Sequence, residues 1–309
     1  MKDRRAITRQ WLSVPRSCEA RLDRINSERI RVLDSKLHRN KLRTAHLTGN
    51  RFRIRLRGTV PEAEVRAAAK IERLLQFGMP NLYGAQRMGH GGSTLAAGWA
   101  LTRGAKRLTR VRTPDDTVHA LNLSDRPLRR LAASAVQGEV FNRTVARRLA
   151  EGVFARVLDG DVCKKSDTGG TFVTDDFARE QRRLEAGELG ITGPMWGSKM
   201  IRALREAALL EAAVLAELGL DEAGFAELGS LAEGTRRVVA VRPENISLHA
   251  EDDGLTVAFS LPAGAFATVF IHELAGPLTP EEAQALAPVT EPPPDTSLAE
   301  EYALEPLEP

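Results

Sequence analysis

Residues 51–57 read Arg51-Phe52-Arg53-Ile54-Arg55-Leu56-Arg57, a strict alternation of basic and apolar side chains. Because successive side chains of a β-strand point to opposite faces, this pattern predicts a strand with one apolar face. Phe52, Ile54 and Leu56 are expected to face a core, and the arginines to line the other face about 7 Å apart. Such a row of cations favours a polyanionic partner.

The segments on either side of this strand predict a sheet covered by helices. Upstream, residues 29–33 alternate in a similar way and predict a second strand with basic outward positions. Downstream, residues 61–76 predict a helix. The apolar stripe expected on that helix consists of Val65, Ala68, Ala69, Leu74 and Leu75. Strands and a helix this close together predict an α+β fold with helices on one side of the sheet.

The character of the sequence changes at Lys106, where helical patterns take over, and sheet patterns return at Asn245. The expected elements are helices over 127–150 and 198–218, strands over 171–173, 245–250 and 255–259, and a helix over 266–274. The last two strands are joined by Asp253-Gly254, a dipeptide typical of hairpin turns.

Length and composition exclude several classes of protein. The chain has 309 residues, which suits two domains, and 42% hydrophobic residues, which suits a globular core. No apolar run approaches the roughly 18 residues that a membrane helix needs, and the first residues lack a signal-peptide pattern. Two cysteines, Cys18 and Cys163, are too few for a disulfide framework or a thiolate metal cage.

The charge is distributed unevenly along the chain. Residues 1–58 contain 17 Lys and Arg against 5 Asp and Glu, whereas residues 242–309 contain 1 against 13. This asymmetry predicts a polyanion-binding face near the N-terminus, with nucleic acid as the first partner to consider. Residues 279–309 hold eight acidic residues, several prolines and no basic residue, and they predict a disordered acidic tail.

The N-terminal sequence contains one candidate for catalysis. Asp3 lies between Lys2 and Arg4-Arg5, and neighbouring cations keep a carboxylate ionised. An ionised carboxylate can act as a nucleophile or a base. By residue type alone, the alternative is a solvated surface aspartate, which is the more common case.

A glycine-rich loop over 77–92 is the second candidate. Five glycines and a proline in 16 residues let the backbone approach another molecule closely. Its side chains Asn81, Tyr83, Gln86 and Arg87 suit stacking on an unstacked base and hydrogen bonding to it. The alternative is an ordinary turn that closes the preceding helix. A phosphate-binding loop is excluded, because no Gly-Lys-Ser/Thr follows.

Taken together and in order, these segments resemble the TruD family of tRNA pseudouridine synthases. The motifs that carry the resemblance are Lys2-Asp3-Arg4-Arg5-Ala6-Ile7-Thr8-Arg9-Gln10, Lys41-Leu42-Arg43, Gly49-Asn50-Arg51-Phe52, Pro80-Asn81-Leu82-Tyr83-Gly84-Ala85-Gln86-Arg87, Ser134, Gly160-Asp161, Thr192-Gly193-Pro194-Met195 and Leu261-Pro262-Ala263-Gly264. They extend over residues 1–275.

The resemblance implies a cofactor-free isomerisation of uridine to pseudouridine in tRNA, at position 13 in the bacterial members. Asp3 would be the nucleophile or base that labilises the glycosidic bond, after which the uracil turns and rejoins through its C5. Asn81 would orient the aspartate, and Tyr83 would pack on the target base, which has to leave its stack. Gln86 and Arg87 would bind the substrate beside them.

The resemblance also implies how the chain is organised and which side chains bind phosphate. The expected phosphate contacts are Arg4, Arg5, Arg9, Lys41, Arg43, Arg51, Arg53 and Arg55. The fold would be the pseudouridine-synthase catalytic domain, a mixed sheet with flanking helices, interrupted by an α/β insertion domain. The implied parts are catalytic residues 1–106, the insertion 107–241, catalytic residues 242–278 and the tail 279–309. We expect a cytoplasmic monomer that binds tRNA, without a metal ion and without a membrane.

One departure from the family pattern concerns the position of Asp3. Family members have several tens of residues before the catalytic motif, and a carboxylate near a fraying terminus is poorly positioned for catalysis. We expect either a start assigned too far downstream, which we favour, or a shortened and weakened protein. The alternative function is a non-catalytic RNA-binding protein inactivated by loss of the N-terminal strands. An enzyme of small metabolites is disfavoured, because it has no use for the arginine-lined strand.

Overall fold

The computed structural model describes residues 6–43, 46–105, 108–112, 118–122 and 125–276. The chain divides into two compact units, one made of residues 1–48 and 278–309 and the other of residues 49–277. The predicted tail 279–309 lies outside the described residues, and the predicted domain boundaries stay predictions.

The described part of the first unit contains one short 3-10 helix, η1 (Arg16–Ile25), and no strand. The predicted strand over 29–33 is therefore wrong. On the apolar side of the alternation, Ile30 is 56% exposed and Val32 is only partly buried. A strand forms where a neighbouring strand or a helix covers it, and an alternating pattern alone does not supply that partner.

The second unit begins with the arginine-rich strand, β1 (Gly49–Arg57), as predicted. It pairs antiparallel with β11 (Gly254–Pro262), which in turn forms a hairpin with β10 (Glu244–Glu251). In this register Phe52 lies opposite Phe259, and their rings stack with centroids 5.3 Å apart. The alternation in β1 thus places its apolar side chains in the core and its arginines on the exposed face.

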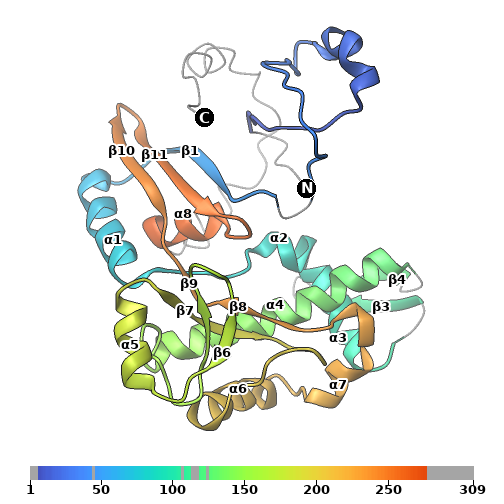
Figure 1. Cartoon of the computed structure of the whole chain (residues 1–309), viewed down its shortest axis with the longest axis vertical. Coiled ribbons are helices and arrows are strands. Elements are labelled where there is room, and N and C mark those ends of the chain that lie inside the picture. Colours follow the sequence, from blue (N-terminus) through green and yellow to red (C-terminus); the bar gives the residue numbers. More distant parts are fainter. Residues whose placement is uncertain (1–5, 44–45, 106–107, 113–117, 123–124, 277–309) are drawn as a thin grey trace. The chain divides into compact units, whose positions relative to one another are not determined.

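Two helices cover the apolar face of this sheet, α1 (Ala63–Phe77) and α8 (Ala267–Ala275) (Figure 1). Their positions confirm the predicted helices, but the predicted stripe on α1 is wrong apart from Leu74. The side chains that α1 buries are Ala67, Ile71 and Leu74, at the i, i+4 and i+7 spacing of one helix face. Val65 and Leu75 are exposed, because α1 turns that side away from the sheet.

A second sheet has four antiparallel strands in the order β6-β5-β7-β8. These are β5 (Val162–Lys165), β6 (Thr171–Val173), β7 (Leu189–Met195) and β8 (Thr235–Val238), and α5 (Phe177–Glu185) lies between β6 and β7 in the chain. The long helix α4 (Arg126–Ala150) confirms its prediction and packs on β7, burying Phe141 and Val145 against Ile191. β3 (Leu108–Arg112) and β4 (Val118–Asn122) form a separate antiparallel pair.

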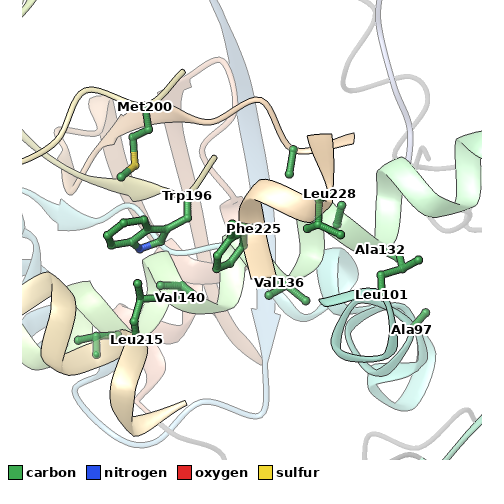
Figure 2. Close-up of a cluster of buried hydrophobic side chains, with 13 residues drawn as sticks. Ala97, Leu101, Ala132, Val136, Val140, Trp196, Met200, Leu215, Phe225 and Leu228 are labelled. Carbon is green, nitrogen blue, oxygen red and sulfur yellow. The ribbon is translucent and has the colours of Figure 1, made fainter. Parts of the chain in front are cut away.

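The other side of α4 packs against α3 (Ser93–Thr102), α6 (Arg205–Glu217) and α7 (Glu222–Glu227), with the 3-10 turn η3 (Gly229–Leu231) after them. Figure 2 shows Val136 and Val140 of α4 beside Trp196 and Phe225 in this core. The predicted helix over 198–218 begins seven residues late, at Arg205. Residues 198–204 are held by tertiary contacts instead, as in the Leu204 N–H bond to Gly160 O at 2.9 Å.

Two buried ion pairs fasten this region. Arg148 donates to both carboxylate oxygens of Asp161 at 2.9 Å, and Arg236 donates to both oxygens of Glu211 at 2.7 and 3.0 Å. Both pairs are bidentate, the geometry in which an arginine best compensates a buried carboxylate. Breaking either pair would leave a buried charge without its partner, which typically costs about 3–5 kcal/mol.

Candidate active site

The predicted loop is anchored at its start by a short backbone ladder. β2 (Met79–Pro80) pairs with β9 (Ala240–Val241), and the Asn81 N–H continues the ladder by donating to Val239 O at 2.8 Å. Two short helical turns follow, α2 (Ala85–Met88) and the 3-10 turn η2 (His90–Gly92). The loop therefore begins on a segment with few degrees of freedom, as a positioned functional group requires.

Asn81 is buried, with 4% of its surface exposed, and both ends of its side-chain amide have partners. Its Nδ2 donates to Val238 O at 2.9 Å, and its Oδ1 accepts from Nη2 of Arg237 at 2.5 Å. Arg237 also donates from Nε to the Asn81 backbone oxygen at 3.1 Å. The orientation of this amide is thus set by strand β8.

Tyr83 is half-buried, and helix α4 holds both its backbone and its ring. The side chain of Asn142 accepts from the Tyr83 N–H at 2.8 Å and donates to the Tyr83 C=O at 3.0 Å. The ring meets Phe141 and Phe266 edge-on, with centroids 5.8 and 5.9 Å away. Gly138 leaves room for the ring, since a Cβ there would lie 3.1 Å from Tyr83 Cδ2.

Two guanidinium groups lie over the Tyr83 ring. Cζ of Arg237 is 4.2 Å and Cζ of Arg87 is 5.4 Å from the ring centroid, within the range of cation–π attraction. Arg87 also donates to the Ser134 hydroxyl. Burial lowers the pKa of Arg237, with the Arg87 charge acting in the same direction, although nearby Tyr83 opposes them. The loop is thus a positively charged site built around an aromatic ring.

The other predicted site residues lie in several places. Gln86 is exposed on α2. Asp3, Arg4 and Arg5 lie outside the described residues, and Arg9, Lys41 and Arg43 are exposed in the first unit. The structure therefore brings together Asn81, Tyr83 and Arg87, whereas Gln86, also on α2, is exposed. The relation of Asp3 to these residues stays a prediction.

The arginines of β1 lie on the exposed face of the three-stranded sheet. Arg51 and Arg53 face Ser260 and Ala258 of β11 across the ladder. Arg55 is ion-paired with Glu251 and Asp253, at 3.1 and 2.7 Å. The ion pair with Arg55 is the main reason that the pKa of the Asp253 carboxyl lies below its usual range. One of the predicted phosphate ligands thus already has acidic partners.

Sequence reasoning missed two residues that hold the site, Arg237 and Asn142. Arg237 follows another arginine, Arg236. Nothing in the sequence shows that Arg236 pairs with the buried Glu211 and that Arg237 contacts the loop at Asn81. Asn142 is one of several polar residues in a long helix, where a solvated position is the usual interpretation. A weak signal existed at Gly138, because a glycine inside a helix often marks a close approach.

Two negative findings apply to the part of the chain that the structure describes. There, no group of three or more His, Cys, Asp or Glu side chains is arranged to hold a metal ion. Among the same residues, no helix combines the length and the apolar character needed to cross a membrane.

The family model of tRNA pseudouridine synthase D matches residues 1–107 and 103–274, so it includes the Asp3 motif, the loop and α4. The chain belongs to the TruD family. Among its relatives, a tRNA pseudouridine synthase D of Anaeromyxobacter dehalogenans strain 2CP-1 is 42% identical over 275 residues, covering 89% of this chain and 75% of the relative. One of Thermus thermophilus is 36% identical over 278 residues, covering 89% of this chain and 71% of the relative.

A solved structure supports the TruD fold. It is a crystal structure described as tRNA pseudouridine synthase D from Methanosarcina mazei, with a TM-score of 0.67 and 20% sequence identity. The similarity covers 85% of this chain and 76% of that chain. This confirms the predicted α+β fold class, and the family match confirms the predicted resemblance.

Proposed function

We propose that this TruD protein isomerises uridine to pseudouridine in tRNA, at position 13. The observation that carries the proposal is the family match over residues 1–274, which includes both the Asp3 motif and the loop that folds around Asn81 and Tyr83. The reaction breaks the bond from N1 of uracil to C1′ of ribose and forms a bond from C5 to the same C1′. The C5 proton is lost and N1 gains one, so no atom is gained or lost overall.

In this mechanism Asp3 is the carboxylate that labilises the glycosidic bond, as nucleophile or base. The target nucleotide has to leave its stack to reach the carboxylate. Asn81 orients Asp3 through its amide, and Tyr83 packs on the uracil. The tight hold on Tyr83 by Asn142 and Phe141 supports this role, because a stacking ring has to be rigid to fix the base it contacts. Gln86 and Arg87 contribute further substrate contacts.

The basic side chains supply the contacts with the RNA backbone. The proposed phosphate ligands are Arg4, Arg5, Arg9, Lys41, Arg43, Arg51, Arg53 and Arg55. Those on β1 support the proposal through their exposure along one sheet face. Phosphate contacts of this kind position an RNA without reading its sequence. We further propose a cytoplasmic monomer that needs no cofactor or metal, with its parts divided at 106/107, 241/242 and 278/279.

The test is pseudouridine formation by the 309-residue chain on unmodified tRNA transcript, read by mass after pseudouridine-selective labelling. The expected result is a product peak at position 13 that is lost in Asp3→Asn, with tRNA binding nearly unchanged. If tRNA is bound and no product forms, the protein is a non-catalytic RNA-binding protein and the proposal fails. Loss of both activity and binding in Asp3→Asn would assign Asp3 a structural role.

A further inference from the structure

Arg237 connects three segments that are far apart along the chain. It lies on β8, and its guanidinium donates to the backbone and the side chain of Asn81 and, from Nη2, to Gly264 O at 2.9 Å. Gly264 lies in the turn between β11 and α8. One side chain thus joins the second sheet, the loop and the turn that follows the first sheet.

The chemistry of arginine decides how the Asn81 amide is oriented. A guanidinium has five N–H donors and no acceptor, so the amide must present its oxygen to Arg237. Its nitrogen then faces Val238 O, which takes one of the two N–H groups at 2.9 Å. In the described part of the chain Val238 O is the acceptor of Nδ2, and the second N–H of this nitrogen has no partner there. Without Arg237, the amide could rotate and present its oxygen to the reacting groups instead.

The same guanidinium also packs on the aromatic side chains of the site. Its Cζ lies 4.2 Å from the centroid of Tyr83 and 5.5 Å from that of Phe141. A planar, delocalised guanidinium stacks on rings while its edge donates hydrogen bonds, which a lysine ammonium cannot do. Arg237 therefore couples the direction of the Asn81 amide to the position of the Tyr83 ring.

We propose that Arg237 is a positioning residue for the isomerisation. It fixes the direction of the Asn81 amide, the group to which the proposed function gives the role of orienting Asp3, and it holds the Tyr83 ring to which the same proposal gives the role of packing on the uracil. This inference rests on the proposed function and adds a residue to it.

The neighbouring Arg236 shows what a purely structural arginine looks like in this fold. It is 8% exposed and forms a bidentate ion pair with Glu211, which cancels its charge inside a core. Arg237 donates instead to neutral oxygens, among them those of Asn81 and Gly264. Because no carboxylate in the described part of the chain is ion-paired with Arg237, its removal should disturb the geometry of the site more than the stability of the fold.

The test compares Arg237→Ala, Arg237→Lys and the control Arg242→Met. Arg242 is an arginine close in sequence that makes one 3.3 Å hydrogen bond to Leu75 O, outside the site, so it controls for the loss of one positive charge. We expect kcat to fall by about 100-fold in Arg237→Ala, the scale of a misplaced catalytic contact, with a much smaller change in tRNA Kd. Arg237→Lys should retain an intermediate kcat, because it keeps one donor but not the stacked fork.

Chemical rescue separates positioning from stability. Added guanidinium at low millimolar concentration should restore part of the kcat of Arg237→Ala and leave Arg242→Met unchanged. The inference is wrong if Arg237→Ala is folded and its kcat matches that of wild type. It is also wrong if added guanidinium does not restore the kcat of Arg237→Ala and Arg237→Lys shows the same loss of kcat. An inactive wild-type protein would instead overturn the proposed function, so the two failures are distinguishable. Thermal unfolding of each variant identifies any that does not fold, and Arg237→Lys then remains as the informative variant.

Discussion

Asn142 accounts for two hydrogen bonds that no other residue type of its size and shape could make. A side-chain amide has a donor and an acceptor side by side, and here they pair with the C=O and the N–H of the same residue, Tyr83. The loop is thereby fastened to α4 at the residue whose ring forms the centre of the site.

We predict that Asn142→Leu weakens the site. The change leaves the N–H and C=O of Tyr83 without partners, and we expect the free energy of unfolding to fall by about 1–3 kcal/mol together with a loss of turnover. Denaturant unfolding and the pseudouridine assay measure the two effects. Arg143→Ala, at an exposed position on the same helix, is the control and should change neither appreciably. Wild-type turnover in Asn142→Leu would show that the two hydrogen bonds between Asn142 and Tyr83 are dispensable.

Cys163 is predicted to make stability depend on alkaline pH. It is fully buried in β5, and burial, with the nearby Asp161 and Glu180 charges, raises the pKa of its thiol from its ordinary value of 9.0 to about 12. The folded state keeps the proton that the unfolded chain loses. The stabilisation is therefore fully present below about pH 9 and is lost as the pH rises toward about 12.

The measurement is the free energy of unfolding between about pH 8 and pH 10, for wild type and for Cys163→Ala. Wild type should lose up to about 1.4 kcal/mol more per pH unit above the unfolded thiol pKa than the variant does. Only the slopes are compared, because the variant also leaves a small cavity that lowers stability at every pH. Equal slopes in the two proteins would contradict a buried neutral thiol.

At the scale of elements, helix α4 contributes side chains to two hydrophobic cores of the second unit. One face carries Phe141 and Val145 toward the four-stranded sheet, and another carries Val136 and Val140 toward α3, α6 and α7 (Figure 2). The approach of α3 to α4 is close because α3 has a glycine, Gly98, at the contact. A Cβ at Gly98 would collide with Ala132 O and a Val136 methyl.

Gly98→Ala is therefore expected to destabilise the protein, although alanine is the better helix former. Overpacking at a helix contact costs about 1–3 kcal/mol, which outweighs the ~1 kcal/mol that alanine contributes in a helix interior. Gly224→Ala in α7 is the matched control. Its Cβ would meet Thr102 O at 3.4 Å, an ordinary contact, so that variant should be neutral or more stable. Thermal or urea unfolding of both variants measures their stability relative to wild type. A Gly98→Ala variant more stable than wild type would refute the close contact.

At the scale of the whole molecule, the charge distribution determines how RNA binding responds to salt. Each phosphate contact releases counterions, so the logarithm of the binding constant falls with the logarithm of salt concentration. The exposed face of β1 in the second unit is a proposed source of such contacts. Its arginines differ, because Arg55 is paired with Glu251 and Asp253, and Arg57 also lies 3.6 Å from Asp253.

We predict that Arg51→Ala reduces the salt slope of tRNA binding by about one and Arg55→Ala by less, because Arg55 must exchange its acidic partners for phosphate. The slopes come from Kd values measured over a series of salt concentrations. Arg156→Ala removes an exposed arginine that pairs with Glu206 and lies off the predicted surface, so its slope should equal that of wild type. Equal slopes for Arg51→Ala and wild type would remove β1 from the RNA-binding surface.

The sequence by itself determined the elements whose pattern is strong and local. The alternation in β1, the long periodic helix α4 and the β10–β11 hairpin were predicted correctly, because side-chain periodicity depends on the chain alone. The hairpin turn is one residue earlier than predicted, at Asp252-Asp253, since Gly254 already pairs with Glu251. The sequence also indicated the family through motifs, and with it the residues of the loop. It failed at residues 29–33 and 198–204, where the local pattern lacked a partner or was overridden by contacts such as Leu204 with Gly160.

Only the tertiary structure decided what surrounds the loop. The packing of β8 brings Arg237, rather than Arg236, to Asn81, which is 156 residues away along the chain. The packing of α4 brings Asn142 to Tyr83, which is 59 residues away. Hydrogen bonds between such distant segments leave no periodic trace in the sequence, because each needs one polar side chain at one position. The physical reason is that periodicity records which face of an element is buried, whereas a site depends on which distant atoms the packing of that face brings within hydrogen-bond reach.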